Sequence, residues 1–156
     1  MTRRLDPYTT APALMKEWQR AACAITASLE PTLTTLVELR ASQINGCANC
    51  LNLHTTLARD HGETDQRLAL LPAWREAPCY TERERAALGW TEALTRLADR
   101  PDLDAAYAPL AARFTEEERV KLTLIINVIN GWNRLSVGFG TWVDPDVVRA
   151  ARAVAA

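Results

Sequence analysis

Cys47, Cys50 and His54 are the residues of this chain whose types and spacing could do chemistry. Residues three, four and seven apart lie on one face of an α-helix, so a helical segment here would align both thiols with the imidazole. Three residues of helical rise span about 4.5 Å, within the range in which two cysteines can form a disulfide. The spacing therefore predicts a cysteine pair that can be oxidised and reduced without a large backbone movement.

The position of this pair also favours reactive thiolates. A free cysteine has a pKa near 8.5, so only about 3% of it is ionised at pH 7. Amide groups at a helix N-terminus act like roughly half a positive charge, and Cys47 and Cys50 fall in the first turn of the expected helix. His54 can accept the proton of Cys50 and then remain beside the thiolate as imidazolium. We therefore expect a lowered pKa at Cys50 and the pairing of nucleophile and base that thiol catalysis requires.

The same residues are open to other interpretations. Haem attachment would need a histidine directly after the second cysteine, where Leu51 stands. Thioredoxin-like proteins share the cysteine spacing but need strands, which the sequence does not predict. Zinc could be bound by the cysteines, His54 and His61, although His61 would lie about 10 Å farther along the helix. We expect no metal and no cofactor, and an inert buried cysteine pair stays open as an alternative.

Three other residues are candidates for chemistry or for the wall of a site. Cys23 stands in an alanine-rich segment and is predicted to be buried. Cys79 is predicted to lie in a loop with no base nearby. Trp132, next to Asn133, is predicted either to pack in the core or to form a wall of the site.

The elements that position these residues are predicted to be helices of a single domain covering residues 1–156. The chain has 156 residues, of which 48% are hydrophobic and 24% are charged, an ordinary composition for one globular domain. Apolar residues recur with helical spacing, and alternating β-branched runs are absent, so the predicted fold class is all-α. The expected helices cover about 12–29, 32–45, 47–61, 64–71, 81–97, 102–114 and 115–135, with a last segment beginning at Asp144-Pro145.

Two capping boxes predict where later helices begin. Thr81 is followed three residues later by Glu84, and Thr115 by Glu118. Between the second and third expected helices, Asn45-Gly46 predicts a break, because both residues tolerate left-handed backbone.

A tripeptide is repeated in the chain. Ile-Asn-Gly at residues 44–46 recurs 85 positions later at residues 129–131. One interpretation is an internal two-fold repeat of two helical half-units, with the chemistry in the first half only. Chance similarity in a helical chain is the alternative.

Charge and hydropathy exclude several kinds of partner. Eighteen basic and nineteen acidic residues leave a net charge of −1, so we expect neither nucleic acid nor an anionic membrane as a partner. The most apolar stretch, residues 120–129, is far too short for a membrane span. A helix here would be apolar on most of its faces, and such a helix is usually covered by a core or a partner, so we predict a homo-oligomer. Arg3-Arg4 precede polar residues, so we expect no export signal and a cytoplasmic location. There the cysteines would stay reduced unless one pair is catalytic.

The run LRASQINGC at residues 39–47, the Cys-x-x-Cys pair and His54 resemble the AhpD-like alkylhydroperoxidases, which belong to the carboxymuconolactone decarboxylase superfamily. The resemblance is strongest over about residues 15–139. It includes GET at 62–64, AWRE at 73–76, ERERAAL at 82–88 and INGWNRL at 129–135.

This resemblance implies an AhpD-like helical fold that forms trimers or hexamers, and thiol-dependent reduction of hydroperoxides. In that family the second cysteine, here Cys50, attacks the peroxide and becomes a sulfenic acid. The first cysteine, here Cys47, then condenses with it to a disulfide. The histidine, here His54, belongs to a proton relay, and a dithiol or lipoyl-type donor restores the reduced pair.

The chain departs from the family pattern at one acidic position. The relay commonly includes a glutamate twelve residues before the first cysteine, where this chain has Thr35. Glu38, three residues later, is the acid that would reach the relay in its place. The departure supports an alternative, a dithiol oxidoreductase or redox sensor without efficient peroxidase activity. Two further alternatives are a carboxymuconolactone decarboxylase-type lyase, which would not need the cysteines, and a non-enzymatic helical oligomer.

Overall fold

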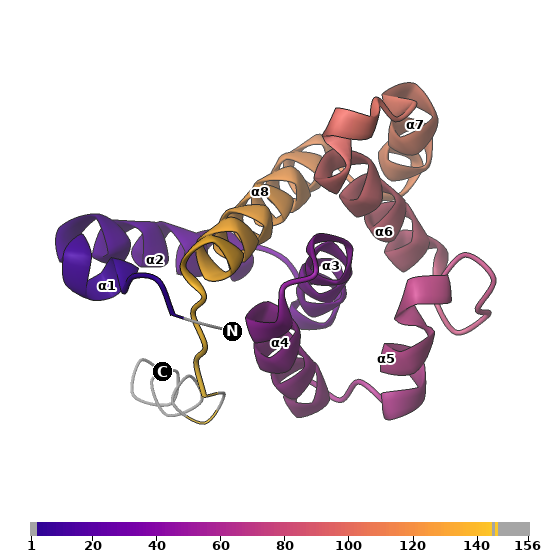
Figure 1. The fold of residues 1–156 in the computed structure, drawn as a ribbon. Helices are drawn as coiled ribbons and strands as arrows, with labels where there is room; N and C mark the ends of the chain where they lie inside the picture. Colours follow the sequence, from indigo (N-terminus) through magenta and orange to yellow (C-terminus); the bar gives the residue numbers. More distant parts are fainter. Residues whose placement is uncertain (1–2, 145, 147–156) are drawn as a thin grey trace.

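A computed structural model describes residues 3–144 and 146, and this part of the chain contains helices and no strand (Figure 1). The all-α prediction is confirmed. The predicted last segment lies, apart from Asp144 and Asp146, outside the described residues. The helices are α1 (Pro7–Thr10), α2 (Pro12–Thr26), α3 (Pro31–Asn45), α4 (Ala48–Asp60), α5 (Asp65–Leu70), η1 (Leu71–Ala73), α6 (Glu82–Thr95), η2 (Leu97–Asp99), α7 (Leu103–Arg113) and α8 (Glu116–Phe139).

The predicted helix starts are set by local hydrogen bonds. Both capping boxes form, so α6 begins after Thr81 and α8 after Thr115. The predicted break after the second expected helix is also present, since α3 ends at Gly46 with a left-handed φ of 64°. The main difference is that α2 ends at Thr26, three residues before its predicted end, whereas α8 continues beyond Leu135 to Phe139, as the prediction allowed.

Helix α3 occupies the centre of the fold, packed against α4, α6 and α8 (Figure 1). Every residue from 33 to 42 is buried. Two of them, Glu38 and Arg40, are charged, and buried charges need partners. The guanidinium of Arg40 donates to the Glu92 carboxylate on α6 at 2.7 Å. The central helix therefore links its neighbours through polar contacts as well as apolar ones.

Glu92 receives several hydrogen bonds in this interior. Besides Arg40, the indole of Trp74 donates to Oε1 at 2.9 Å, and Arg75 donates to Oε2. Burial by itself would raise the pKa of Glu92, but the hydrogen bonds from Trp74, Arg75 and Arg40 lower it. The carboxylate is thus held ionised between α3, α6 and the η1 segment.

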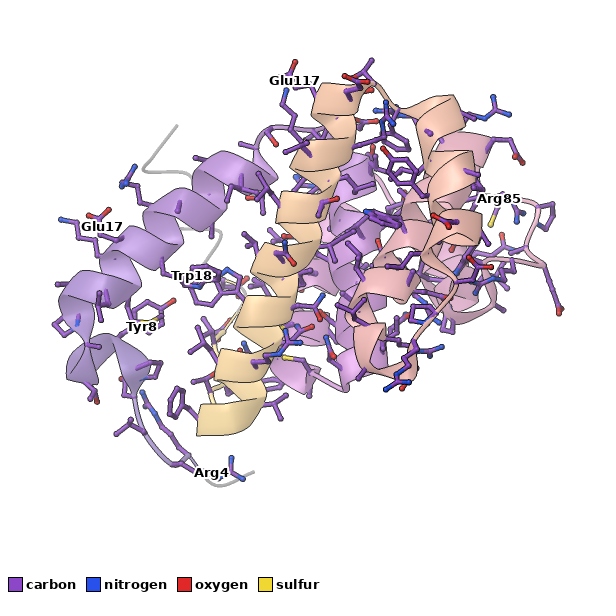
Figure 2. The ribbon with its side chains drawn as sticks, turned by 90° about the horizontal axis from the view of Figure 1, so that it is seen from above. Arg4, Tyr8, Glu17, Trp18, Arg85 and Glu117 are labelled. Atoms are coloured by element: carbon purple, nitrogen blue, oxygen red, sulfur yellow. The ribbon has the colours of Figure 1, made fainter. Side chains whose placement is uncertain are left out.

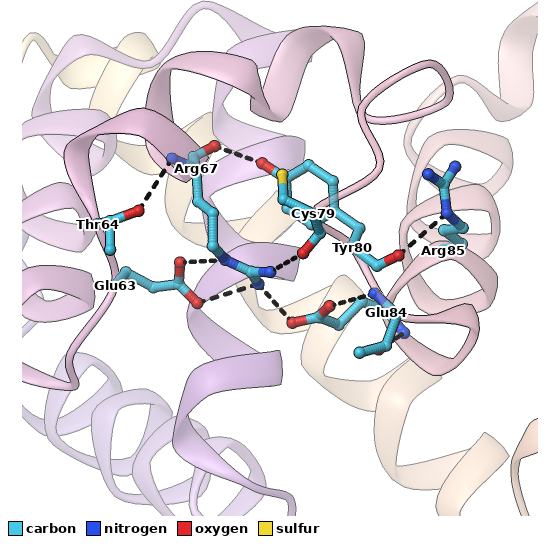
Figure 3. Close-up of polar contacts among 8 residues, drawn as sticks. Glu63, Thr64, Arg67, Cys79, Tyr80, Glu84 and Arg85 are labelled. Carbon is cyan, nitrogen blue, oxygen red and sulfur yellow. Dashed lines mark hydrogen bonds and ion pairs between the residues drawn. The ribbon is translucent and has the colours of Figure 1, made fainter.

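A second polar cluster joins α5 to the start of α6 (Figure 3). Arg67 binds the carboxylate of Glu63 at 2.8 Å and that of Glu84 at 2.5 Å, and it donates to the carbonyl oxygen of Cys79. The hydroxyl of Tyr80 donates to the carbonyl of Arg67. These contacts hold the loop between η1 and α6, where Cys79 lies as predicted.

The apolar core consists of two large clusters and a small one. The first lies between α3, α6, α7 and α8, and the second between α3, α4, α6 and η1. The small cluster contains Ala41, Cys47, Cys50 and Ile129, with Trp132 packed against it. The predicted reactive pair therefore lies at the meeting point of α3, α4 and α8.

Helices α1 and α2 lie to one side of the body and pack on it mainly through α8 (Figures 1 and 2). The ring of Trp18 crosses α8 at Gly131, and its centroid lies 5.5 Å from that of Trp132. Only one face of α2 is covered in this way. Cys23 lies on another face and is exposed, so the prediction that it is buried was wrong.

The two Ile-Asn-Gly tripeptides differ in local structure but meet in space. Asn45 ends α3, whereas Asn130 lies inside α8, and the Nδ2 of Asn45 donates to Oδ1 of Asn130 at 2.9 Å. The predicted two-fold repeat stays a prediction. Across the described part of the chain, no helix combines the length and hydropathy that crossing a membrane requires.

Replacing Gly131 should test the packing of α2 on α8. In Gly131→Ala the new Cβ would lie 2.8 Å from an atom of the Trp18 ring, so we expect the free energy of unfolding to fall by about 1–3 kcal/mol. Gly138→Ala is the matched control on the same helix, because open space surrounds that position and alanine favours helix by up to about 1 kcal/mol. Urea denaturation measures both, and equal effects would contradict the packing.

Candidate active site

The first turn of α4 positions the cysteine pair. Cys47 is the N-cap residue, and its sulfur accepts a hydrogen bond from the backbone N–H of Cys50 at 3.4 Å. Gly46 allows the chain to turn from α3 into α4 with a left-handed φ, which a side chain would strain. The prediction that the third helix begins near Cys47 is therefore confirmed.

The two sulfurs are in direct contact. Both cysteines are free thiols, only 1% and 3% exposed, and their Sγ atoms lie 2.6 Å apart. The predicted juxtaposition on one face is confirmed. The sulfurs are close enough for a disulfide to form with little backbone movement.

His54, one turn along α4 from Cys50, forms a buried pair with Glu38 of α3. The Nδ1 of His54 lies 3.0 Å from Oε2 of Glu38, and both side chains are about nine-tenths buried. The two atoms are close but do not form an aligned hydrogen bond. The reach of Glu38 from α3 to His54 on α4, expected from the sequence, is present.

Thr35 is directed to the other histidine. Its hydroxyl lies 3.3 Å from Nδ1 of His61, at the opposite end of α4 from Cys47, and it also donates to the carbonyl of Pro31. The acid at this site therefore comes from one turn farther along α3 than in the family pattern. Within residues 3–144 and 146, no three His, Cys, Asp or Glu side chains gather in a way that could hold a metal ion.

The sequence predicted a lowered pKa at Cys50, but in the structure the pKa of Cys47 is lowered and that of Cys50 is raised. The hydrogen bond from Cys50 lowers the pKa of Cys47 to about 6, assisted by the N–H of Cys50 and by hydrogen bonds from Ser136 and Asn133. Donation to Cys47, together with burial, raises the pKa of Cys50. The predicted lowering at Cys50 was wrong, because the hydrogen bond between Cys50 and Cys47 and the burial of Cys50 both raise its pKa. The reduced pair thus carries one negative charge and one shared proton.

Helix α8 contributes polar groups that the sequence analysis did not assign to the site. The Oγ of Ser136 lies 3.8 Å from the Sγ of Cys50 and accepts from Nδ2 of Asn49 at 3.3 Å. Asn133 is 1% exposed, donates to Ser42 at 3.0 Å and accepts from Asn45 at 2.8 Å. Two signals in the sequence indicated that α8 approaches the first motif: the repeated tripeptide just before these residues, and Trp132, which was predicted to pack in the core or form a wall of the site and packs against the cysteine cluster.

A cavity of about 400 Å³ opens beside the pair, between the start of α4 and the end of α8. Its wall includes Cys47, Asn49 and Ser136, with Val137 and Trp142 as apolar neighbours. The segment after α8 closes one side, because the N–H of Val143 donates to Oδ1 of Asn49 at 2.6 Å. A small molecule in this cavity would reach Cys47.

Comparison with known sequences gives one family and two relatives. Residues 12–93 match the model of the carboxymuconolactone decarboxylase family. The chain is 39% identical over 141 residues to YdfG of Bacillus subtilis, covering 90% of this chain and 96% of that one. It is 28% identical over 116 residues to YnjA of Escherichia coli, covering 74% and 61% of the two chains. Both relatives are uncharacterised proteins.

Solved structures share the fold. A protein of unknown function from Agrobacterium tumefaciens, for which a role as the antioxidant defence protein AhpD has been suggested, is 39% identical and superposes with a TM-score of 0.85 over 92% of this chain and 99% of that one. The debrominase Bmp8 is similar at 20% identity with a TM-score of 0.67, over 74% of this chain and 62% of that one. A cysteine-to-alanine variant of Bmp8, in complex with 2,3,4-tribromopyrrole, is 18% identical and superposes with a TM-score of 0.77. The match covers 92% of this chain and 78% of that one. At these identities the likeness to Bmp8 shows the fold alone.

The shared proton predicts how the stability of the reduced protein depends on pH. The pKa of Cys47 is about 6 in the folded protein and about 8.5 in an unfolded chain, so the free energy of unfolding should rise, by at most about 3 kcal/mol, as pH increases across that interval. The raised pKa of Cys50 should make the free energy of unfolding fall again at higher pH. Denaturation of the reduced protein from pH 5 to 10 measures this, and Cys47→Ser should lose the rise. Parallel curves for the two proteins would refute the assignment.

Proposed function

The chain belongs to the carboxymuconolactone decarboxylase family, and from this premise we propose that it is a thiol peroxidase that reduces hydroperoxides through Cys47 and Cys50. One observation carries the proposal: two buried free thiols 2.6 Å apart stand at a helix N-terminus, one turn along the helix from His54, which is paired with buried Glu38. The similarity to the Agrobacterium protein, with its suggested antioxidant role, supports the same chemistry.

The proposed reaction starts from the singly charged pair. His54 takes the proton released on ionisation, and the Glu38 carboxylate stabilises the imidazolium. When the shared proton resides on Cys47, the Cys50 thiolate attacks the terminal oxygen of the peroxide and the O–O bond breaks. Cys50 becomes a sulfenic acid, and the imidazolium gives its proton to the departing alkoxide, forming an alcohol.

The second step closes the disulfide. The sulfur of Cys47 attacks the sulfur of the Cys50 sulfenic acid, an S–S bond forms, and the departing hydroxide leaves as water with the thiol proton of Cys47. The peroxide has then been reduced by two electrons and the pair oxidised by two. A dithiol or lipoyl-type donor, supplied from outside the chain, would restore the thiols.

The burial of the pair supports a small substrate. Neither sulfur is more than 3% exposed, so a disulfide on the surface of another folded protein could not reach it without rearrangement. The cavity of about 400 Å³ would admit a small hydroperoxide. We retain the dithiol oxidoreductase or redox sensor as the second candidate, because the family glutamate is replaced by Thr35.

The proposed working form is a homo-oligomer, a trimer or hexamer, in the cytoplasm. Helix α8 supports it: Leu122, Ile125 and Ile126 are buried, whereas Val120 and Leu124 on its outer face are 60% and 42% exposed. A second copy of the chain would remove these apolar side chains from water.

Stoichiometric peroxide should convert Cys47 and Cys50 to a disulfide and leave Cys23 and Cys79 reduced. Mass spectrometry of the treated protein tests this, together with trapping of sulfenic acid in the single variants. Cys47→Ser should accumulate sulfenic acid at Cys50, and Cys50→Ser should not react at Cys47.

Other outcomes would overturn specific parts of the proposed function. Sulfenic acid on Cys47 alone would reverse the two roles, as the cavity wall at Cys47 would allow. Reduction of a protein disulfide without consumption of peroxide would establish the second candidate. Decarboxylation of a muconolactone that survives Cys50→Ser would make the protein a lyase.

Glu38→Gln should slow peroxide reduction by at least about tenfold, because a neutral amide cannot stabilise the imidazolium of His54. Glu63→Gln is the matched control, since the side chain of Glu63 is also largely buried and ion-paired, but with Arg67 and away from the cysteines. Stopped-flow measurement of the oxidation of reduced protein separates the two variants. Equal rates in Glu38→Gln and Glu63→Gln would remove Glu38 from the relay.

A further inference from the structure

Ser136 touches the reacting pair but has no part in the mechanism above. It lies on α8, is 7% exposed, and its Oγ is 3.8 Å from the Sγ of Cys50. Within the described residues its hydroxyl has no other hydrogen-bond acceptor than the sulfurs. The hydroxyl of Ser136 is therefore placed to bond to the cysteine pair rather than to the backbone of α8.

Asn49 fixes the direction in which this hydroxyl can donate. The backbone N–H of Val143 donates to Asn49 at 2.6 Å, so the amide oxygen of Asn49 faces Val143 and the amide nitrogen faces Ser136. That nitrogen donates to the Oγ of Ser136 at 3.3 Å. One lone pair of the serine oxygen is occupied in this way, and the hydroxyl hydrogen is left to turn toward sulfur.

From these contacts we propose that Ser136 is a further catalytic residue: its hydroxyl accepts from the Cys50 thiol while the pair is protonated and donates to the charged sulfur once the pair is ionised. This inference rests on the proposed thiol chemistry. A serine hydroxyl suits the task, because it can both accept and donate and carries no charge that must itself be buried. Its hydrogen bond to an ionised sulfur would stabilise the attacking form of the enzyme.

The effect of Ser136 on the cysteine pair can be separated from the effects of the titratable groups. The sulfurs contact each other, and His54, paired with Glu38 of α3, lies one turn along α4 from Cys50, whereas α8 contributes the neutral side chains of Asn133 and Ser136. The hydrogen bond between the sulfurs lowers the pKa of Cys47 and raises that of Cys50, burial raises both, and the α8 side chains lower both. Loss of Ser136 should therefore shift ionisation of the pair to higher pH.

The test follows the thiolate absorbance of the reduced protein near 240 nm as pH is raised, with no peroxide present. Wild type should ionise first near pH 6. Ser136→Ala should ionise about one pH unit higher, and Ser136→Thr, which keeps the hydroxyl, should ionise as wild type does. Thr91→Val is the matched control, because it removes a buried hydroxyl that bonds only within α6, and it should leave the titration unchanged.

A titration of Ser136→Ala that matches wild type would overturn the inference. If that variant does not fold, Ser136→Thr and Ser136→Val give the comparison, since the two side chains share a shape and differ by the hydroxyl. Failure of the proposed function is seen separately: a wild type that consumes no peroxide while Ser136→Ala still shifts the titration would leave Ser136 as a thiolate partner in another reaction.

Discussion

The contact between the sulfurs of Cys47 and Cys50 is the interaction on which this site depends. The sulfurs lie 2.6 Å apart in an interior where neither residue is more than 3% exposed, and above about pH 6 the lowered pKa of Cys47 and the raised pKa of Cys50 leave the pair with one proton and one negative charge. The N-cap position of Cys47 supplies a backbone N–H to that charge, and a buried charge without such donors would be neutralised instead. The acidity of one thiol and the weak acidity of the other are thus two consequences of a single shared proton.

The rest of the fold brings three helices to this contact. Helix α3 passes through the middle of the molecule with Glu38 and Arg40 buried, and each requires a partner on a different neighbour, His54 on α4 and Glu92 on α6. Helix α8 closes the site with Ser136, packed so closely under Trp18 that only glycine fits at position 131. The polar contacts within the core fix the relative positions of the helices that the apolar contacts hold together.

Membership of the family does not by itself identify the reaction, so the residues of the site have to. The family match and the 39% identical relatives establish ancestry, whereas the likeness to the debrominase Bmp8 at 18–20% identity shows how far the fold extends. A fold of this kind hosts more than one chemistry, so the residues around the sulfurs carry the functional argument. In this chain the acid beside the histidine comes from Glu38, one turn along α3 from Thr35, and the neighbour on α8 is a serine.

Local rules determined the helices and the cysteine pair. Capping boxes at Thr81 and Thr115, the break at Gly46 and the three-residue spacing of the cysteines depend on neighbours in the chain, and all were predicted correctly. The exposure of the face of α2 that carries Cys23 and the approach of Ser136 across 86 residues depend on how helices pack, as do the hydrogen bonds from Ser136 and Asn133 that lower the pKa of Cys47. The repeated Ile-Asn-Gly makes the difference plain: it ends α3 at Gly46 and continues α8 at Gly131, because a helix packed on both sides overrides the turn that the same residues favour alone.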